Sequence, residues 1–178
     1  MIDARHYRAE EALRDGRAVV VRGIRADDKH AMLEAFHGLE SHTLYLRFFA
    51  SIGEPSTDDL RWWTEVDFAS IVRLVVCLPL PDGERIIGGA SYALLSPGHP
   101  AAGAEISFTI EEDFQRQGLA AKLLQHLVAI ARSAGITRFV AEILPENRAM
   151  VSVFARSGLP MKRWFDNGVV HVSLDLSG

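Results

Sequence analysis

The first third of the chain has the pattern of one strand followed by helices. Residues 17–25 (RAVVVRGIR) are rich in β-branched side chains, which predicts a strand. The acidic pair at residues 27–28 precedes apolar residues at helical spacing, and Ser41 precedes a second such stretch. A third helix is expected after Ser56, because Asp59 stands where a capping box needs a carboxylate. Three helices should therefore follow the first strand.

The middle of the chain has the pattern of three consecutive strands, at residues 71–78, 85–95 and 102–110. Asp82-Gly83 is a turn signal between the first two. Within the second strand, the pair Gly88-Gly89 predicts a bulge or a close approach of two backbones. After residue 110 the apolar period changes from two to about 3.6, which predicts a helix.

The second half alternates helices with strands. The apolar stripe between Gly118 and Gly135 predicts a helix, 139–144 a strand and 147–157 a helix. A strand, helix and strand in this order imply a parallel pair of strands joined by a right-handed crossover. The Asn-Gly turn within 164–176 predicts a closing hairpin. We expect one α+β domain built on a mixed sheet.

Composition restricts the class of protein. The chain has 178 residues, 48% of them hydrophobic, and a net charge of −4, which argues against broad nucleic-acid binding. No apolar run is long enough to span a bilayer, and the charged N-terminus does not resemble a secretory signal, so a cytoplasmic protein without membrane contact is expected. Cys77, the single cysteine, lies in an apolar run and is interpreted as a buried structural thiol.

The loop at residues 115–120 (QRQGLA) joins a predicted strand to a predicted helix. A helix start leaves backbone N–H groups unpaired and carries the positive end of the helix dipole. Gly118 allows a ligand to approach the backbone, and Ala120 keeps the next position small. The pattern predicts a pyrophosphate cradle, although a glycine before a helix, taken alone, would favour a purely structural turn. The sequence has neither a P-loop motif nor a G-x-G-x-x-G motif after the first strand.

Two motifs resemble those of the GNAT acetyltransferase superfamily. IEEDFQRQGLAAKLL resembles motif A, in which a Q/R-x-x-G-x-G/A loop holds the pyrophosphate of acetyl-CoA, with Gln115, Gly118 and Ala120 at the defining positions. ENRAMVSVFARSGL resembles motif B, with Asn147 where the pantetheine arm is met. The resemblance implies a GNAT-like mixed sheet flanked by helices over 17–178, after an N-terminal extension at 1–16. It implies acetyl-CoA as donor and no metal.

The resemblance assigns the donor-binding residues. They are Phe108, Thr109, Ile110, Gln115, Arg116, Gln117, Gly118, Leu119, Ala120, Ala121 and Asn147. A finer resemblance, in LRDGRAVVVRGIRADDK and HTLYLRFF, is to Pat-like bacterial protein lysine acetyltransferases. It implies a protein acceptor, such as a metabolic enzyme, and a monomer or homodimer.

The acceptor amine must lose a proton, because a free lysine has a pKa of about 10.4. Glu105 shares a strand face with Ser107 and Thr109, where a carboxylate is costly unless it is paired or used. We expect burial to raise its pKa and Glu105 to act as the general base, which is also the presumed role of this glutamate in Pat-like enzymes. The alternative is a structural ion pair with an arginine.

The same strand should also hold the thioester. A bulge or splay at residues 108–110 would free backbone N–H groups to stabilise the oxyanion, and the amine would attack directly without an acyl-enzyme. Phe154 stands where many superfamily members have a tyrosine that protonates the leaving thiolate. We therefore expect the CoA thiolate to leave with help from water.

Two alternatives to a protein lysine acetyltransferase remain open. One is a small-molecule amine acetyltransferase, and the other is a non-catalytic acyl-CoA-binding sensor, against which Glu105 argues. Four aromatic residues at helical spacing are candidates for the acceptor side, but core packing is the favoured interpretation of them. They are Tyr45, Phe49, Trp62 and Trp63.

Overall fold

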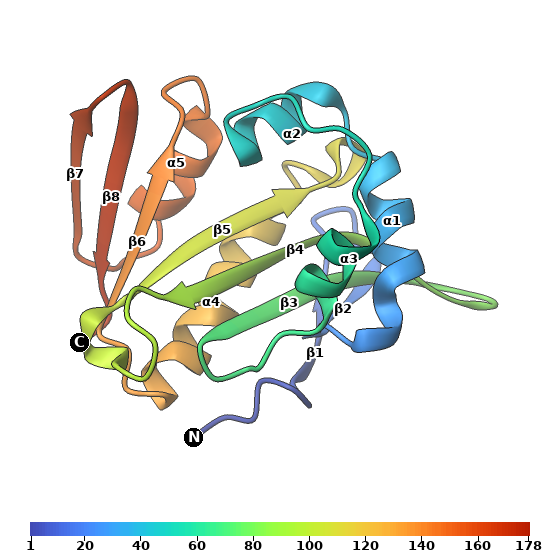
Figure 1. Ribbon diagram of the computed structural model, residues 1–178, viewed down its shortest axis with the longest axis horizontal. Helices are drawn as coiled ribbons and strands as arrows, with labels where there is room; N and C mark the ends of the chain where they lie inside the picture. Colours follow the sequence, from blue (N-terminus) through green and yellow to red (C-terminus); the bar gives the residue numbers. More distant parts are fainter.

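The computed structural model describes residues 1–178, and its centre is one eight-stranded sheet. The strand order is β1-β2-β3-β4-β5-β6-β8-β7, and every neighbouring pair is antiparallel except β5 and β6 (Figure 1). The strands are β1 Arg8–Ala12, β2 Ala18–Gly23, β3 Ile71–Leu80, β4 Gly83–Leu94, β5 Ala104–Ile110, β6 Arg138–Ile143, β7 Met161–Asp166 and β8 Val169–Asp175. The predicted mixed sheet of an α+β protein is confirmed.

Five α-helices flank the sheet. They are α1 Lys29–His37, α2 Ser41–Phe48, α3 Thr57–Thr64, α4 Leu119–Ser133 and α5 Arg148–Ala155. In Figure 1 the first three lie in front of the sheet and α4 lies behind it, as the crossover between parallel β5 and β6. The apolar stripe of α4 is buried in the main core, with Leu123 and Leu127 fully enclosed. The sheet therefore has one face covered by α4 and another that meets α1, α2 and α3.

Two local predictions from the sequence, a helix cap and a hairpin turn, can be compared directly with the structure. Ser56 caps α3: its Oγ accepts from the N–H of Asp59 at 3.1 Å, and Asp59 accepts from the N–H of Ser56 at 2.8 Å. The hairpin turn has positive φ at both Asn167 (49°) and Gly168 (77°), as a type I′ turn requires. These predictions are confirmed.

The glycine pair in β4 marks both a bulge and a close contact. The register between β3 and β4 shifts at Val76/Cys77, next to Gly88. A Cβ on Gly88 would lie 2.8 Å from the carbonyl oxygen of Thr109, and one on Gly89 would lie 2.5 Å from that of Leu74. Larger residues would therefore push β4 away from its neighbours.

Some predicted helix caps were wrong. Ser41 is the first residue of α2, whose N-cap is Glu40. Asp28 makes no side-chain cap, because its carboxylate accepts two hydrogen bonds from the buried Arg22 guanidinium, each 2.8 Å long. Arg22 also pairs with Glu84 at 2.5 Å. The aspartate thus balances a buried charge and accepts the N–H of Arg25 at 2.7 Å, at the start of the short 3-10 turn Ala26–Asp28, but it does not cap α1.

The N-terminal segment contains a strand that the sequence pattern did not predict. β1 pairs with β2 along its whole length, from Arg8↔Arg22 to Ala12↔Ala18. The segment RAEEA lacks an apolar alternation because β1 is an edge strand with little to bury. The division between an extension at 1–16 and a domain at 17–178 stays a prediction.

Cys77 is fully buried, and burial raises the pKa of its thiol to about 12. The interpretation as a structural thiol is confirmed, because a thiol with this pKa carries almost no thiolate at neutral pH. No helix combines the length and the hydrophobicity that a membrane crossing would need.

The two parallel strands at the centre of the sheet separate soon after they pair. β5 and β6 are in register only at Ala104↔Phe139 and Glu105↔Val140. Beyond Glu105 the strands diverge, and Figure 1 shows the opening between them, with α5 beside β6. The predicted splay is confirmed, and it opens the sheet towards the loop at residues 115–120.

Candidate active site

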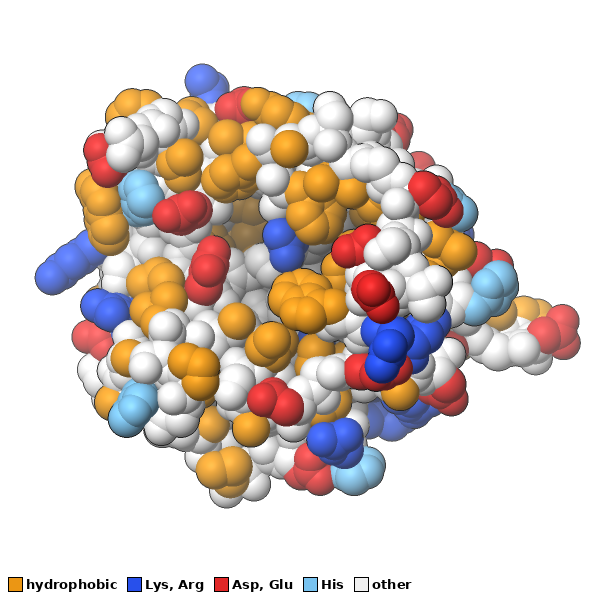
Figure 2. Space-filling model, in the orientation of Figure 1, with side chains coloured by type: hydrophobic (Ala, Val, Ile, Leu, Met, Phe, Trp, Pro, Cys, Tyr) orange, Lys and Arg blue, Asp and Glu red, His pale blue; other side chains and the backbone are white.

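The opening between β5 and β6 leads into a cleft of about 1020 Å³, large enough for a nucleotide-sized ligand. Ten of the eleven predicted donor-binding residues line this cleft, and so does Glu105. Gln117 does not line the cleft, because its Oε1 accepts from the N–H of Asp15 at 3.2 Å. Figure 2 shows this face of the molecule hollowed, with hydrophobic side chains around the hollow.

The start of α4 presents a run of free backbone donors. The first helical hydrogen bond runs from Lys122 N–H to Gly118 O, at 3.2 Å. The N–H groups of residues 116–121 donate to no acceptor in the protein. Arg116 (φ 60°) and Gly118 (φ 83°) both adopt left-handed conformations, which turn the chain across the helix start. Unpaired donors at the positive end of a helix dipole favour a bound anion.

The cleft is basic although the protein is acidic. Its charged lining comprises three glutamates (Glu105, Glu142, Glu146) and six arginines (Arg14, Arg47, Arg116, Arg132, Arg148, Arg156). Arg14 lies in the turn between β1 and β2, and its Nη1 donates to the carbonyl of Arg116 at 3.2 Å. Sequence reasoning missed Arg14 because β1 was not predicted. This excess of positive charge suits a ligand that carries several phosphates.

Besides Gln117, two more of the predicted side chains form hydrogen bonds within the protein. The Gln115 Nε2 donates to the carbonyl of Ile110 at 2.9 Å and to Thr43 Oγ1 at 3.3 Å. The Asn147 Oδ1 accepts from the N–H of Met150 at 3.3 Å and so caps α5. Both side chains fix the backbone around the cleft, and their predicted contacts with a donor stay predictions.

The open edge of β5 supplies further donors. The N–H of Glu111 donates to Ile87 O at 3.0 Å, so odd-numbered positions of β5 are bonded to β4. Alternate residues of an antiparallel strand point the other way, so the N–H groups of Phe108 and Ile110 face the gap left by β6. These are the donors that the sequence predicted for a thioester oxygen and pantetheine amides.

Glu105 does not have the surroundings that the sequence led us to expect. It is the last residue of β5 that pairs with β6, and its side chain is exposed. The carboxylate makes neither a hydrogen bond nor an ion pair within 4.0 Å, so the structural ion pair is also absent. The expected burial was wrong because β6 diverges at this residue and leaves the side chain at the mouth of the cleft.

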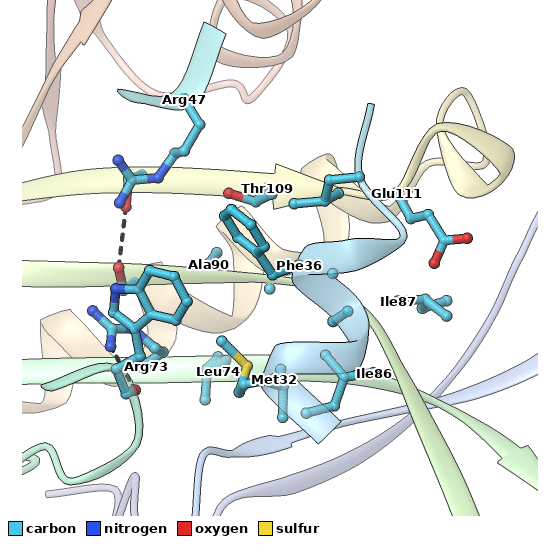
Figure 3. Close-up of a pocket in the computed structure, with 18 of the residues that line it drawn as sticks. Met32, Phe36, Arg47, Arg73, Leu74, Ile86, Ile87, Ala90, Thr109 and Glu111 are labelled. Atoms are coloured by element: carbon cyan, nitrogen blue, oxygen red, sulfur yellow. Dashed lines mark hydrogen bonds between the residues drawn. The ribbon is translucent and has the colours of Figure 1, made fainter. Parts of the chain in front are cut away.

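A second cavity, of about 130 Å³, lies between the sheet and helices α1, α2 and α3 (Figure 3). Its lining is mostly apolar and includes Met32 and Phe36 from α1. Four residues line both the cavity and the cleft: Arg47, Phe48, Ser107 and Thr109. The two spaces therefore meet on the strand that carries Glu105.

The aromatic residues of α2 and α3 are not core residues. Trp62 and Trp63 line the second cavity and Phe49 lines the cleft, whereas Tyr45 lines neither. Trp62 is 61% exposed and Tyr45 is 41% exposed. The favoured interpretation of core packing was wrong, because none of the four side chains is among the buried residues of the core.

A sheet opened beside a helix start with free N–H groups, next to a second cavity, can hold a phosphate-bearing ligand beside a second molecule. The chain belongs to the acetyltransferase (GNAT) family, whose sequence profile matches residues 33–159. Its class is therefore that of a GNAT acetyltransferase.

Two curated relatives and one solved structure are similar to the chain over most of its length. Acetyltransferase Pat of Mycolicibacterium smegmatis is 31% identical over 166 residues, which cover 92% of this chain and 47% of that protein. Acetyltransferase PA5475 of Pseudomonas aeruginosa is 30% identical over 164 residues, which cover 90% of this chain and 86% of that protein. The GNAT domain of S. lividans PAT superposes with a TM-score of 0.85 at 34% identity, covering 94% of this chain and 96% of that domain. The chain thus spans about half the length of the M. smegmatis relative.

Proposed function

We propose that this protein transfers the acetyl group of acetyl-CoA to the ε-amine of a protein lysine, with Glu105 as the general base. The observation that carries this proposal is that the donor cleft and the second cavity meet at Ser107 and Thr109, on the strand of Glu105. A donor in the cleft and an acceptor in the cavity would then face each other across one strand. The free N–H groups of residues 116–121 and the basic lining of the cleft support the placement of the phosphate-bearing donor there.

The reaction follows from these positions. Glu105 takes a proton from the acceptor ammonium, and the neutral nitrogen then attacks the thioester carbonyl carbon. The N–H groups of Phe108 and Ile110, which face the gap, would stabilise the negative charge that develops on the carbonyl oxygen. The carbon–sulfur bond breaks as the amide forms, and the thiolate takes a proton from water because Phe154 has no hydroxyl group. Cys77 forms no acyl-enzyme, since it is buried and its pKa is about 12.

The protein lysine is the finer part of the proposal. It is supported by the similarity to acetyltransferases named Pat and by the open, exposed position of Glu105, which a lysine on another protein could approach. We also propose a cytoplasmic location and a monomeric or homodimeric state, both of which stay predictions.

A panel of acceptors tests the proposal. The protein is incubated with radiolabelled acetyl-CoA and free amines, lysine peptides or folded candidate proteins, and the label in each product is counted. We expect label in lysine side chains of peptides or proteins. Label only in small amines would show instead that the protein is a small-molecule amine acetyltransferase. CoA binding without label in any acceptor would favour a non-catalytic sensor.

A further inference from the structure

A polar row crosses the mostly apolar second cavity. Arg73 on β3, Ser91 on β4 and Ser107 on β5 stand directly opposite one another in the sheet. The two serine Oγ atoms are 3.1 Å apart and hydrogen-bonded. Arg47 completes the row from α2, and Figure 3 shows Arg47 and Arg73 approaching the same part of the cavity from opposite sides. We call these four residues the arginine–serine row.

Arg47 has no close partner for its charge: burial lowers the pKa of its guanidinium, and the Glu105 carboxylate, which works against this, lies more than 4.0 Å away. Its guanidinium forms no hydrogen bond and no ion pair, and its one specific contact is with the ring of Phe48, at 4.8 Å. A guanidinium presents five donors in a planar fork that matches a carboxylate. An arginine held half-buried at a cavity wall with all five donors free is arranged for a ligand rather than for the fold.

Arg73 has a structural contact but no counter-charge. Its Nη1 donates to the carbonyls of Trp63 (2.5 Å) and Trp62 (3.3 Å) at the end of α3. No carboxylate lies within 4.0 Å of it. Burial, together with the charge of Arg47, lowers the pKa of Arg73 to about 10, so the side chain remains charged at neutral pH. Two partly buried cations that face the same part of a cavity repel each other, and an anion between them would relieve this repulsion.

We propose that the arginine–serine row binds a carboxylate of the acceptor, so that the preferred acceptor is a lysine with a carboxylate close to its amine. This inference rests on the proposed function. Ser107 and Glu105 are two residues apart on the same face of β5, which is about 7 Å. The four-carbon stem of a lysine spans a similar distance, so its own α-carboxylate could reach the row while its amine reaches Glu105. An aspartate or glutamate next to the acceptor lysine in a protein would present a carboxylate to the row in the same way.

The test compares two acceptors that differ only in this charge. Nα-acetyl-lysine carries a free carboxylate and Nα-acetyl-lysine amide does not. We expect the wild-type protein to prefer the carboxylate about 10–100-fold in kcat/KM, and the CoA-bound protein to bind it more tightly in calorimetry. In Arg47→Met this ratio should fall to about 1, whatever the absolute rate. Arg61→Met, which removes an exposed arginine of α3 outside the cavity, should keep the wild-type ratio.

The outcomes separate the inference from the proposed function. Acetylation of both acceptors without preference, or a preference that survives in Arg47→Met, would overturn the row as a carboxylate site and leave the proposed function standing. Carboxylate binding that depends on Arg47, without acetylation of any acceptor, would support the row and overturn the proposed function. Peptides that end in lysine, compared with peptides that place glutamate beside an internal lysine, then distinguish the two sources of the carboxylate.

Discussion

Glu105 shows how far a single residue can be understood from its place in the sequence. The alternation along its strand correctly places Glu105 on one face with Ser107 and Thr109, because side chains in a strand alternate. Its burial could not be predicted, because that depends on whether β6 continues beside it, and the separation of β6 is a property of the whole sheet. The same holds for Arg47, whose neighbours come from strands far apart in the sequence.

Replacing Glu105 with glutamine tests its role as base. We expect turnover to fall about 10²–10⁴-fold at neutral pH, with acetyl-CoA affinity and thermal stability unchanged. Stability should hold because the carboxylate has no hydrogen bond or ion pair to lose. The deficit should shrink as pH rises towards the lysine pKa of about 10.4, since more acceptor amine is then already neutral. A pH–rate profile and a melting curve check this, and a stable variant with undiminished turnover would remove Glu105 from the mechanism.

At the scale of elements, the sequence predicts what local chemistry determines. The apolar stripe of α4, the Ser56 cap and the Asn-Gly turn depend on neighbouring residues, and each was found where it was predicted. The missed strand β1 has a polar sequence and becomes a strand only because β2 offers it an edge. The turn that follows it brings Arg14 to the loop before α4, so one missed element also hid one residue of the cleft.

The conformation of Gly118 gives a prediction for the cradle. An added Cβ would meet nothing closer than the Nε of Arg14, at 3.7 Å, so the difficulty for a side chain is the backbone φ of 83°. Gly118→Val should lose roughly 1–2 kcal/mol of stability and bind CoA much more weakly, because the loop must rearrange and the β-branched side chain would stand beside the phosphates.

Gly135 is the matched control, with a φ of 80° at the other end of α4 and open space around it. Gly135→Val should show a similar loss of stability with unchanged CoA affinity. Calorimetry on the two folded variants checks this pair, and equal affinities would remove the cradle assignment.

Glu11 links β1 to α4 through ion pairs. Its carboxylate pairs with Lys122 at 2.6 Å and with His126 at 2.9 Å, and His126 in turn meets the Tyr7 hydroxyl at 2.6 Å. Burial works to raise the pKa of Glu11, but the hydrogen bonds from Lys122 and His126 outweigh it and hold the pKa below the usual 4.5. A lowered folded-state pKa stabilises the fold above the unfolded value, and this contribution is lost as pH falls through the folded value.

We therefore expect Glu11→Gln to reduce the free energy of unfolding by about 1–3 kcal/mol at pH 7, and by less at a pH below 4. Glu10→Gln changes the exposed neighbour, which has no ion pair, and should leave stability nearly unchanged. Urea denaturation at both pH values is the measurement. A deficit that stays constant with pH would show that the charge of Glu11 is not what holds β1.

At the scale of the whole molecule, positive charge is concentrated in the cleft although the protein as a whole is negative. The chain carries a net charge of −4, yet six arginines and three glutamates line the cleft. A phosphate-bearing donor is thus attracted to one region of an otherwise acidic surface, and its association should slow as salt is added. Net charge alone, read from the sequence, excluded nucleic acid as a general partner but could not locate this basic region.

The divergence of β5 and β6 also has a mechanical consequence. It leaves two pieces of sheet, β1 to β5 and β6 to β8, whose backbones are joined at only two residue pairs. A CoA molecule lying in the gap would touch both pieces and link them where the protein's own hydrogen bonds stop. Hydrogen–deuterium exchange should therefore slow in β6 on CoA saturation and change little in β2 and β3. Substrate binding would then complete the sheet, and the folded protein would be most rigid when it is ready to react.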